Sequence, residues 1–192
     1  MSDGERGASA FKLVAIVLGG ALTLAAAGYS LALGRYAFDG PAMEPTLVHG
    51  EGAFVLKRWL AGAPLAGEIW ILSSPADGIE VVKRVIATGG QTIEIRSDRL
   101  YIDGEPVSTE RVDCPETVRN ADEAICHRER IGERSWLTLK ASYGVPDDLA
   151  PTVVPEGCVF VLGDHRDRSN DSRNPHIGPI CAENHVGRVF GE

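Results

Sequence analysis

The chain has 192 residues, 44% of them hydrophobic, which suits one sizeable globular domain with or without a membrane anchor and is too short for several large domains. Its formal net charge of -8 argues against a nucleic-acid partner, because phosphate binding needs a clustered lysine and arginine surface. We therefore expect no nucleic-acid binding.

The first element is an apolar stretch, LVAIVLGGALTLAAAGYSLALG, which runs from Leu13 to Gly34 without a charge. As a helix it would extend about 33 Å, enough to cross a hydrocarbon core of about 30 Å. A cleavable signal peptide is the alternative, since Ala25, Ala26 and Ala27 offer the small residues of a cleavage site. The apolar run continues through Leu33, and this excess length favours a retained transmembrane helix.

Charges beside this stretch indicate its orientation. Two positive residues, Arg6 and Lys12, precede it and one, Arg35, follows it. Since positive residues gather on the cytoplasmic side of a membrane helix, this difference of one residue favours a cytoplasmic N-terminus. We predict a single pass through the cell membrane, with residues 1–12 as a cytoplasmic tail and 13–34 as the anchor. Residues 35–192 would form a domain on the extracytoplasmic face, in contact with the lipid bilayer.

Short β-branched runs, separated by Gly, Pro and Asp, follow the stretch and predict a mostly β domain. The segment IEIRSDRLYIDG predicts a hairpin with Ser97 and Asp98 in its connection. The predicted strands are Ala53 to Leu56, Glu68 to Leu72, Val81 to Ile86, Thr92 to Ile95, Leu100 to Ile102, Cys158 to Leu162 and Val186 to Phe190.

Residues from about 107 to 155 are richer in charge and proline and predict a small inserted lobe. The chain has four cysteines, without the paired spacing of a zinc site: Cys114, Cys126, Cys158 and Cys181. Their even number fits two disulfides outside the cytosol, with free buried thiols as the alternative. Of three pairings, we favour the sequential one.

Two further segments carry unusual residues. In VVKRVIATGG, alternation along a strand predicts that either Lys83 or Arg84 points inward, where burial would lower the pKa of a lysine. In GPAMEPTL, Pro41 and Pro45 would by themselves mark only a turn.

A third segment, GDHRDRSNDSR from Gly163 to Arg173, interleaves aspartates with arginines. A solvated loop of ion pairs is one interpretation. A calcium loop is another, but the spacing differs from the EF-hand and the arginines would repel a cation. The five histidines also lack metal-ligand spacing, so we expect neither a metal nor a cofactor.

In this order behind an N-terminal anchor, the three segments resemble the type I signal peptidases, membrane-bound serine endopeptidases that remove signal peptides from exported proteins. The likeness extends from Gly40 to Gly187 and includes GEIWILSSP. The motif Ser-Met-x-Pro-Thr appears with alanine first, at residues 42–46, and Lys-Arg-Val appears at residues 83–85. The last motif, Gly-Asp-Asn-Arg and Ser-x-Asp-Ser-Arg, appears at residues 163–166 and 169–173, with His165 in place of asparagine.

The resemblance implies a Ser/Lys dyad in which a neutral Lys83 is the general base, since a serine hydroxyl needs a base to become nucleophilic. It implies that Ser169 orients the Lys83 amine, with Asp164, Asp171 and Arg173 as supports. It also implies an oxyanion hole from the backbone N–H of Ala42, with a backbone contact from Gly40. Signal peptides of exported preproteins would be the binding partners.

Ala42 occupies the nucleophile position and has no hydroxyl, so the chain as written is expected to bind but not cut. The other motif residues are retained, which favours an engineered serine-to-alanine substitution over a natural, non-catalytic pseudopeptidase that binds signal peptides. Pilus-maturation peptidases and self-cleaving repressors of the same clan are further alternatives, disfavoured by the complete last motif and the anchor. Trp59 and Trp70 suit either the lipid headgroup region or the core.

Overall fold

The computed structural model describes residues 17–20, 23, 28, 32–118, 124–143 and 147–190. The chain separates into two compact units, residues 1–34 and 35–192. In the first unit, residues 17–20 are helical. Most of the predicted anchor, residues 13–34, lies outside the described residues. Within the described part of the chain, no helix is both long and apolar enough to cross a membrane.

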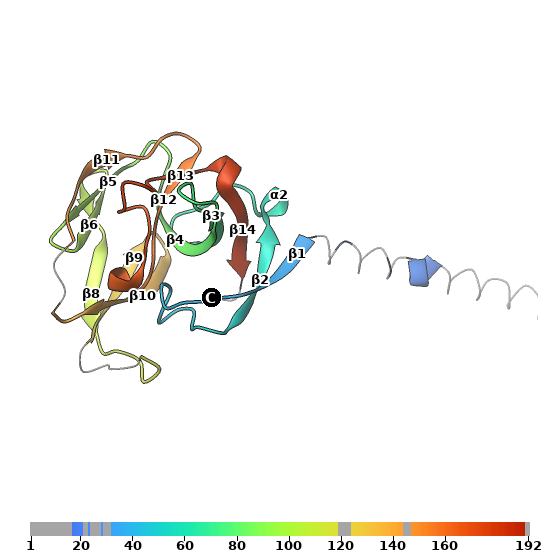
Figure 1. Cartoon of the computed structure of the whole chain (residues 1–192), viewed down its shortest axis with the longest axis horizontal. Helices are drawn as coiled ribbons and strands as arrows, with labels where there is room; N and C mark the ends of the chain where they lie inside the picture. The colour runs from blue at the N-terminus through green and yellow to red at the C-terminus, as the bar shows by residue number, and fades with distance from the viewer. Residues whose placement is uncertain are drawn as a thin grey trace, which may run out of the picture. The chain divides into compact units, whose positions relative to one another are not determined.

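From residue 35 onward, the regular secondary structure that the structure describes is mainly β-strands, arranged in three sheets (Figure 1). The largest sheet has seven strands in the order β1-β2-β14-β3-β4-β12-β13. Its strands are β1 (Leu33–Ala37), β2 (Gly52–Lys57), β3 (Ile69–Ser73), β4 (Glu80–Thr88), β12 (Cys158–Leu162), β13 (Ile180–Cys181) and β14 (His185–Phe190). Every strand predicted in these regions is present within one or two residues of its expected bounds.

The second sheet holds four strands in the order β11-β5-β6-β7. These are β5 (Thr92–Arg96), β6 (Arg99–Ile102), β7 (Glu105–Pro106) and β11 (Leu149–Val153). The predicted hairpin is formed by β5 and β6, which pair Arg96 with Arg99. Ser97 and Asp98 both have positive φ in its two-residue connection, the geometry that a tight hairpin turn requires.

The third sheet, β10-β9-β8, is made within the region predicted to be an inserted lobe. Its strands are β8 (Ser108–Val112), β9 (Ala124–Ile131) and β10 (Arg134–Ala141). A disulfide joins Cys114 to Cys126 at one end of this sheet, and a second joins Cys158 on β12 to Cys181 on β13. This is the sequential pairing of the three that four cysteines allow.

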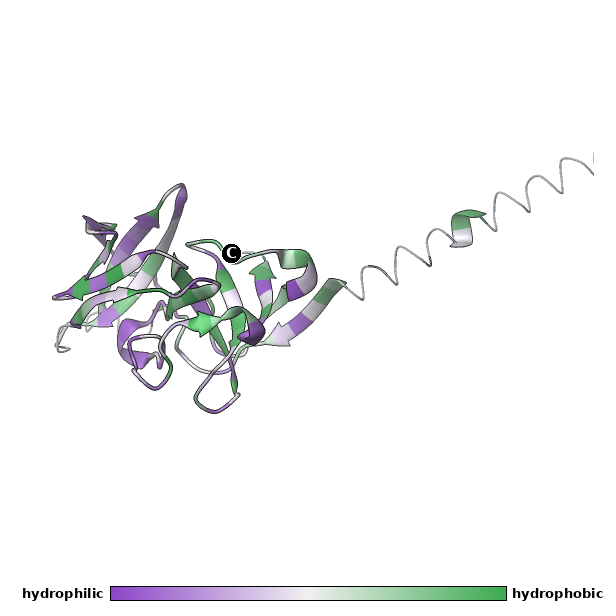
Figure 2. Cartoon of the chain, turned by 90° about the horizontal axis from the view of Figure 1, so that it is seen from above, coloured by the Kyte–Doolittle hydropathy of each residue, from purple (hydrophilic) through white to green (hydrophobic). Residues whose placement is uncertain are grey.

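Hydrophobic and hydrophilic residues alternate along many of the strands (Figure 2), as expected where one face of a strand is buried. The central strands β3 and β12 are instead buried along nearly their whole length, because apolar clusters cover both of their faces. Trp70 on β3 is fully buried and so belongs to the core, whereas Trp59 in the short helix α2 (Arg58–Ala61) is 66% exposed.

Candidate active site

The segment that carries Ala42 is a compact turn between β1 and β2. Pro41 and Pro45 restrict its backbone, the Pro41 carbonyl accepts a hydrogen bond from the Glu44 N–H, and the Met43 carbonyl accepts one from the Leu47 N–H. The Met43 side chain is buried in the apolar cluster beneath the turn. This buried anchor fixes the position of the neighbouring Ala42, whose side chain is partly exposed.

The second contribution comes from β4, which places two consecutive cations in the interior. Lys83 is 4% exposed and Arg84 2% exposed. The expectation that only one of them points inward was wrong. The two side chains do alternate, but both faces of β4 are covered here. Lys83 lies near Asp171 of the 163–173 loop, and Arg84 contacts Asp164 of the same loop and Trp136 on β10.

Lys83 donates a hydrogen bond from Nζ to the Val82 carbonyl at 3.0 Å and has no ion-pair partner among the described residues. Burial lowers its pKa, and the carboxylates of Asp171 and Asp164 offset this only in part. A lowered pKa increases the fraction of neutral amine, which is the form that can accept a proton. Lys83 therefore has the physical properties of a general base.

The third contribution is the loop from Gly163 to Arg173, which includes the short helix η2 (Arg166–Arg168) and is held by its own charged side chains. Asp171 accepts a hydrogen bond from the Gly163 N–H at 3.0 Å and is paired with Arg173 at 2.8 Å. Burial lowers the pKa of Arg173, but its bonds with Asp171 more than offset this, so the pKa is raised. The guanidinium also donates to the carbonyls of Arg166 and Ser169, which closes the loop.

These three segments converge at Gly163. A Cβ atom placed there would lie 2.3 Å from Ser169 Oγ and 2.5 Å from the Ala42 carbonyl oxygen. Because Leu162 is paired with Arg84 in the antiparallel β4–β12 ladder, Gly163 follows at the level of Lys83. Ala42, Lys83 and Ser169, which are far apart in the sequence, thus lie around Gly163, where the absence of a side chain leaves space for Ser169 beside the Ala42 carbonyl.

The geometry differs from the implied dyad in two hydrogen bonds. Ser169 Oγ is buried and has no hydrogen-bond partner among the described residues, so it does not orient the Lys83 amine in this structure. The Gly40 N–H donates to His49 Nδ1 at 3.2 Å and is not turned toward an oxyanion. Both groups would need a small rearrangement to play the roles that the resemblance implies.

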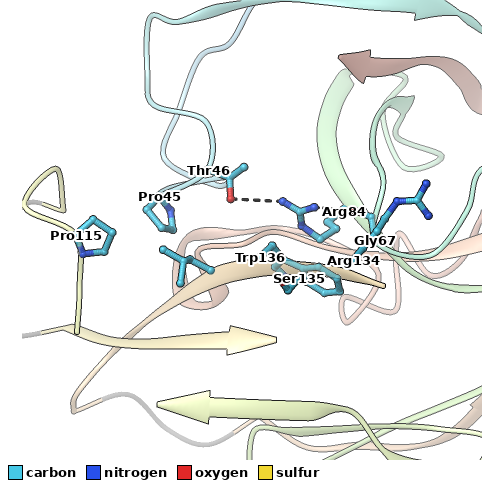
Figure 3. Close-up of a pocket in the computed structure, with 9 residues that line it drawn as sticks. Pro45, Thr46, Gly67, Arg84, Pro115, Arg134, Ser135 and Trp136 are labelled. Carbon is cyan, nitrogen blue, oxygen red and sulfur yellow. Dashed lines mark hydrogen bonds between the residues drawn. The ribbon is translucent and has the colours of Figure 1, made fainter. Parts of the chain in front are cut away.

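On the face of β4 opposite Lys83, Arg84 forms a network that the sequence did not predict. Figure 3 shows the part of it in which Arg84 donates to the Thr46 hydroxyl and lies beside Trp136. The Arg84 guanidinium donates two hydrogen bonds of 2.8 Å to Asp164 and one of 2.7 Å to the Gly67 carbonyl, and it lies 4.8 Å from the centre of the Trp136 ring. The Thr46 hydroxyl donates to Asp164 at 2.5 Å. The network ties the Ala42 turn to β4 and to β10.

Asp147 was also missed by sequence reasoning, because its only signal is a charge in a loop. It accepts a hydrogen bond of 2.5 Å from Arg173 and lies 3.7 Å from Lys140, so it links the 163–173 loop to β10. Among the described residues, no group of histidine, cysteine or acidic side chains is arranged to hold a metal ion.

Comparison with known proteins identifies the family. A family model described as signal peptidase, peptidase S26, matches residues 10–191. The chain belongs to this signal peptidase family. The predicted family is therefore confirmed.

Individual relatives agree with the family assignment. Signal peptidase I of Bacillus licheniformis is 37% identical over 141 residues, 72% of this chain and 65% of that protein. Signal peptidase I T of Bacillus subtilis strain 168 is 35% identical over 153 residues, 79% of this chain and 69% of that protein. The chain thus spans about two thirds of the length of these relatives. A crystal structure of a signal peptidase I from Enterococcus faecalis is 27% identical and covers 67% of this chain and 98% of that one, with a TM-score of 0.42.

Proposed function

We propose that this protein is built as a signal peptidase I, a serine endopeptidase that removes signal peptides from exported preproteins, and that only the nucleophile is missing. The observation that carries the proposal is the convergence of residue 42, Lys83 and Ser169 at Gly163, with a buried lysine whose pKa is lowered. Residues 13–34 would anchor the protein in the cell membrane, with residues 35–192 on the extracytoplasmic face.

With a serine at position 42, each residue would have a definite role. The hydroxyl would attack the scissile carbonyl while the neutral Lys83 amine takes its proton, and the residue-42 N–H would donate to the oxyanion. The Lys83 ammonium would then protonate the leaving amine, and water would hydrolyse the ester. Ser169 would orient the amine, while Asp164, Asp171 and Arg173 hold the loop and strand in place.

Alanine at position 42 prevents the first step, since no hydroxyl is present to form the ester. The chain as written would therefore hold a signal peptide without cleaving it. A serine-to-alanine substitution made to trap substrate accounts for this most simply, because the other motif residues, Lys83 and Ser169 among them, are retained. A natural receptor that binds signal peptides without catalysis is the second candidate, and Ala42 itself motivates it. The codon for residue 42 in the source gene separates these two origins.

The proposal is tested by Ala42→Ser. The restored protein, in detergent, should cleave an exported precursor at its signal-peptide junction, whereas the chain as written should not. A matched variant, Ala42→Ser with Lys83→Met, should again be inactive. Failure of the serine variant to cleave any of a panel of precursors, with its fold intact, would refute the peptidase assignment.

A further inference from the structure

A hollow of about 500 Å³ is lined by residues of both smaller sheets, and neither Lys83 nor Ser169 is among them. The strands β5 and β6 contribute one part of its wall, and β8, β9 and β10 contribute another. Its size falls in the range of about 300–1,000 Å³ that is typical of small-molecule sites. Ile95, Leu100 and Leu162, which are buried members of an apolar core cluster, also line it. The hollow therefore has room for a small organic molecule.

The three-stranded sheet turns a polar face toward this hollow. The polar side chains that line the hollow lie two residues apart along each strand, which places them on one face of the sheet. They are Thr109 and Arg111 on β8, His127 and Glu129 on β9, and Thr138 and Lys140 on β10. Glu129, Thr138 and Lys140 are buried, although a sheet face that is turned to the interior is ordinarily apolar. Burial of polar groups costs free energy unless they are paired, so this face favours a polar ligand.

The wall of the hollow carries more positive than negative charge, and we call it the basic hollow. Five basic and three acidic residues line it, which is an excess of two positive charges in a chain with a formal net charge of -8. The basic residues are Arg99, Arg111, Lys140, Arg166 and Arg173, and the acidic residues are Asp98, Glu129 and Asp147. A ligand with two negative charges would balance this excess.

The three carboxylates are already paired with three of these basic residues. The pairs are Arg166 with Glu129, Arg173 with Asp147, and Lys140 with Asp98. Arg99 on β6 and Arg111 on β8 have no ion-pair partner among the described residues, and Arg99 lies 6.0 Å from the centre of the Tyr101 ring. These two guanidinium groups come from different sheets and supply the excess charge.

His127 lies among these charges and is sensitive to them. In the β8–β9 ladder it is paired with Arg111, so the two side chains are neighbours on the same face. Burial lowers the pKa of His127, and the guanidinium groups of Arg111 and Arg166 lower it as well. The carboxylates of Glu129 and Asp98 offset this only in part. An anion bound in the basic hollow would favour the imidazolium and raise the pKa of His127.

We propose that the basic hollow binds a small organic phosphate monoester through the guanidinium groups of Arg99 and Arg111. A phosphate monoester carries a charge of about -1.5 to -2 at pH 7, which matches the excess of two positive charges. Its terminal oxygens can accept hydrogen bonds from both guanidinium groups, whose planar sets of donors fit phosphate. A carboxylate, with a single charge, would balance only half of the excess. Ile95 and Leu100 would contact the organic part of the ligand.

The proposal is tested by calorimetric titration of the full chain, in detergent micelles, with glycerol 3-phosphate. This ester should bind, whereas glycerol, which lacks the phosphate, should not. Arg99→Gln and Arg111→Gln should each raise Kd about 10-fold, as expected for the loss of charge-assisted hydrogen bonds. The matched control is Arg128→Gln on the other face of β9, which removes the same charge and should leave Kd unchanged. Equal effects of the three variants would overturn the proposal, because attraction by net charge alone would explain them.

The imidazole of His127 gives a second measurement that needs no variant. In ¹H NMR titrations, glycerol 3-phosphate should raise the pKa of His127, whereas the resonances of His176, an exposed histidine outside the basic hollow, should not shift. Soluble esters and lipid headgroups share the phosphate monoester group, and phosphatidic acid in phosphatidylcholine vesicles holding the full chain separates them. A response of His127 to phosphatidic acid that Arg111→Gln abolishes would identify a lipid headgroup, and a response to glycerol 3-phosphate alone would identify a soluble ester. No response of His127 to either compound would overturn the proposal.

Discussion

Lys83 and Arg84 are adjacent buried basic residues on β4, and their side chains differ in how many partners compensate their charge. Arg84 is matched with a carboxylate in bidentate geometry, a backbone carbonyl and an aromatic ring. Lys83 has one backbone carbonyl for its amine and no ion pair among the described residues, and burial lowers its pKa. Arginine stays charged under almost all conditions, whereas lysine can lose its proton when it is desolvated.

The difference shows how one strand supports structure and chemistry at once. The Arg84 side joins β4, the Ala42 turn and β10 through a satisfied ion pair, and removal of either partner would leave a buried charge. On the Lys83 side the amine has little compensation for its burial, which costs stability and lowers its pKa, as the proposed role of general base requires. On this account, Lys83 is needed for activity, whereas Arg84 is needed to hold β4, the Ala42 turn and β10 together.

The largest effect is expected from Lys83→Met in the Ala42→Ser protein. Loss of the general base should lower kcat/KM by at least about 10⁴-fold, because the serine hydroxyl is not activated without it. Cleavage of a precursor under single-turnover conditions measures this, with Lys57→Met on the exposed face of β2 as the matched control. Retention of more than a tenth of the activity would show that Lys83 is not the base.

Arg84→Met should act on stability instead. It leaves the Asp164 carboxylate buried without its cation, so the free energy of unfolding should fall by about 3–5 kcal/mol. The control is Arg96→Met, which breaks an exposed pair with Glu94 and should cost less than about 1 kcal/mol. Urea unfolding followed by tryptophan fluorescence compares the two. Equal costs would contradict the structural role given to Arg84.

Gly163→Ala tests the close packing of Ser169 and the Ala42 turn around Gly163. The new methyl group would overlap Ser169 Oγ and the Ala42 carbonyl, so we expect a loss of about 1–3 kcal/mol in stability and of most activity in the Ala42→Ser protein. Gly20→Ala, which meets no atom within 4 Å, is the control. Full activity of Gly163→Ala would mean that the three segments are not closely packed during catalysis.

Much of the fold was predictable because hydrophobic alternation and turn residues are local signals. The β5–β6 hairpin follows from Ser97 and Asp98 between two alternating runs. Burial of both Lys83 and Arg84 was not predictable by the same means, since alternation along β4 describes one covered face, and the second cover comes from segments distant in the sequence. Trp70 was likewise undecided until the packing around β3 was known.

The candidate site also has a part that the sequence predicts and a part that it does not. The motifs identified Ala42, Lys83 and Ser169, and the structure brings them to Gly163. The partners of Arg84 and Asp147 depend on side-chain contacts between segments that are distant in the sequence. No pattern of residues along the chain describes such contacts.

A smaller effect is expected in the pH dependence of stability that Lys83 causes. Because the folded pKa of Lys83 lies below its unfolded value of about 10.4, the folded state binds fewer protons between these two values. The contribution of Lys83 to stability is therefore present above the unfolded pKa and is lost as pH falls through the folded pKa. Relative to the chain as written, Lys83→Met should gain most stability near pH 7 and progressively less toward pH 10. A gain that does not vary with pH would contradict a shifted pKa, and Lys57→Met should show no such trend.

The central claim is that Lys83 is held ready to act as a base even though position 42 has no hydroxyl. Titration of the lysine side chains by ¹³C NMR tests it directly in the chain as written, which contains only four lysines. We predict that one resonance titrates below the ordinary lysine pKa of about 10.4 and disappears in Lys83→Arg. Titration of the Lys83 resonance at or above that value would contradict the account.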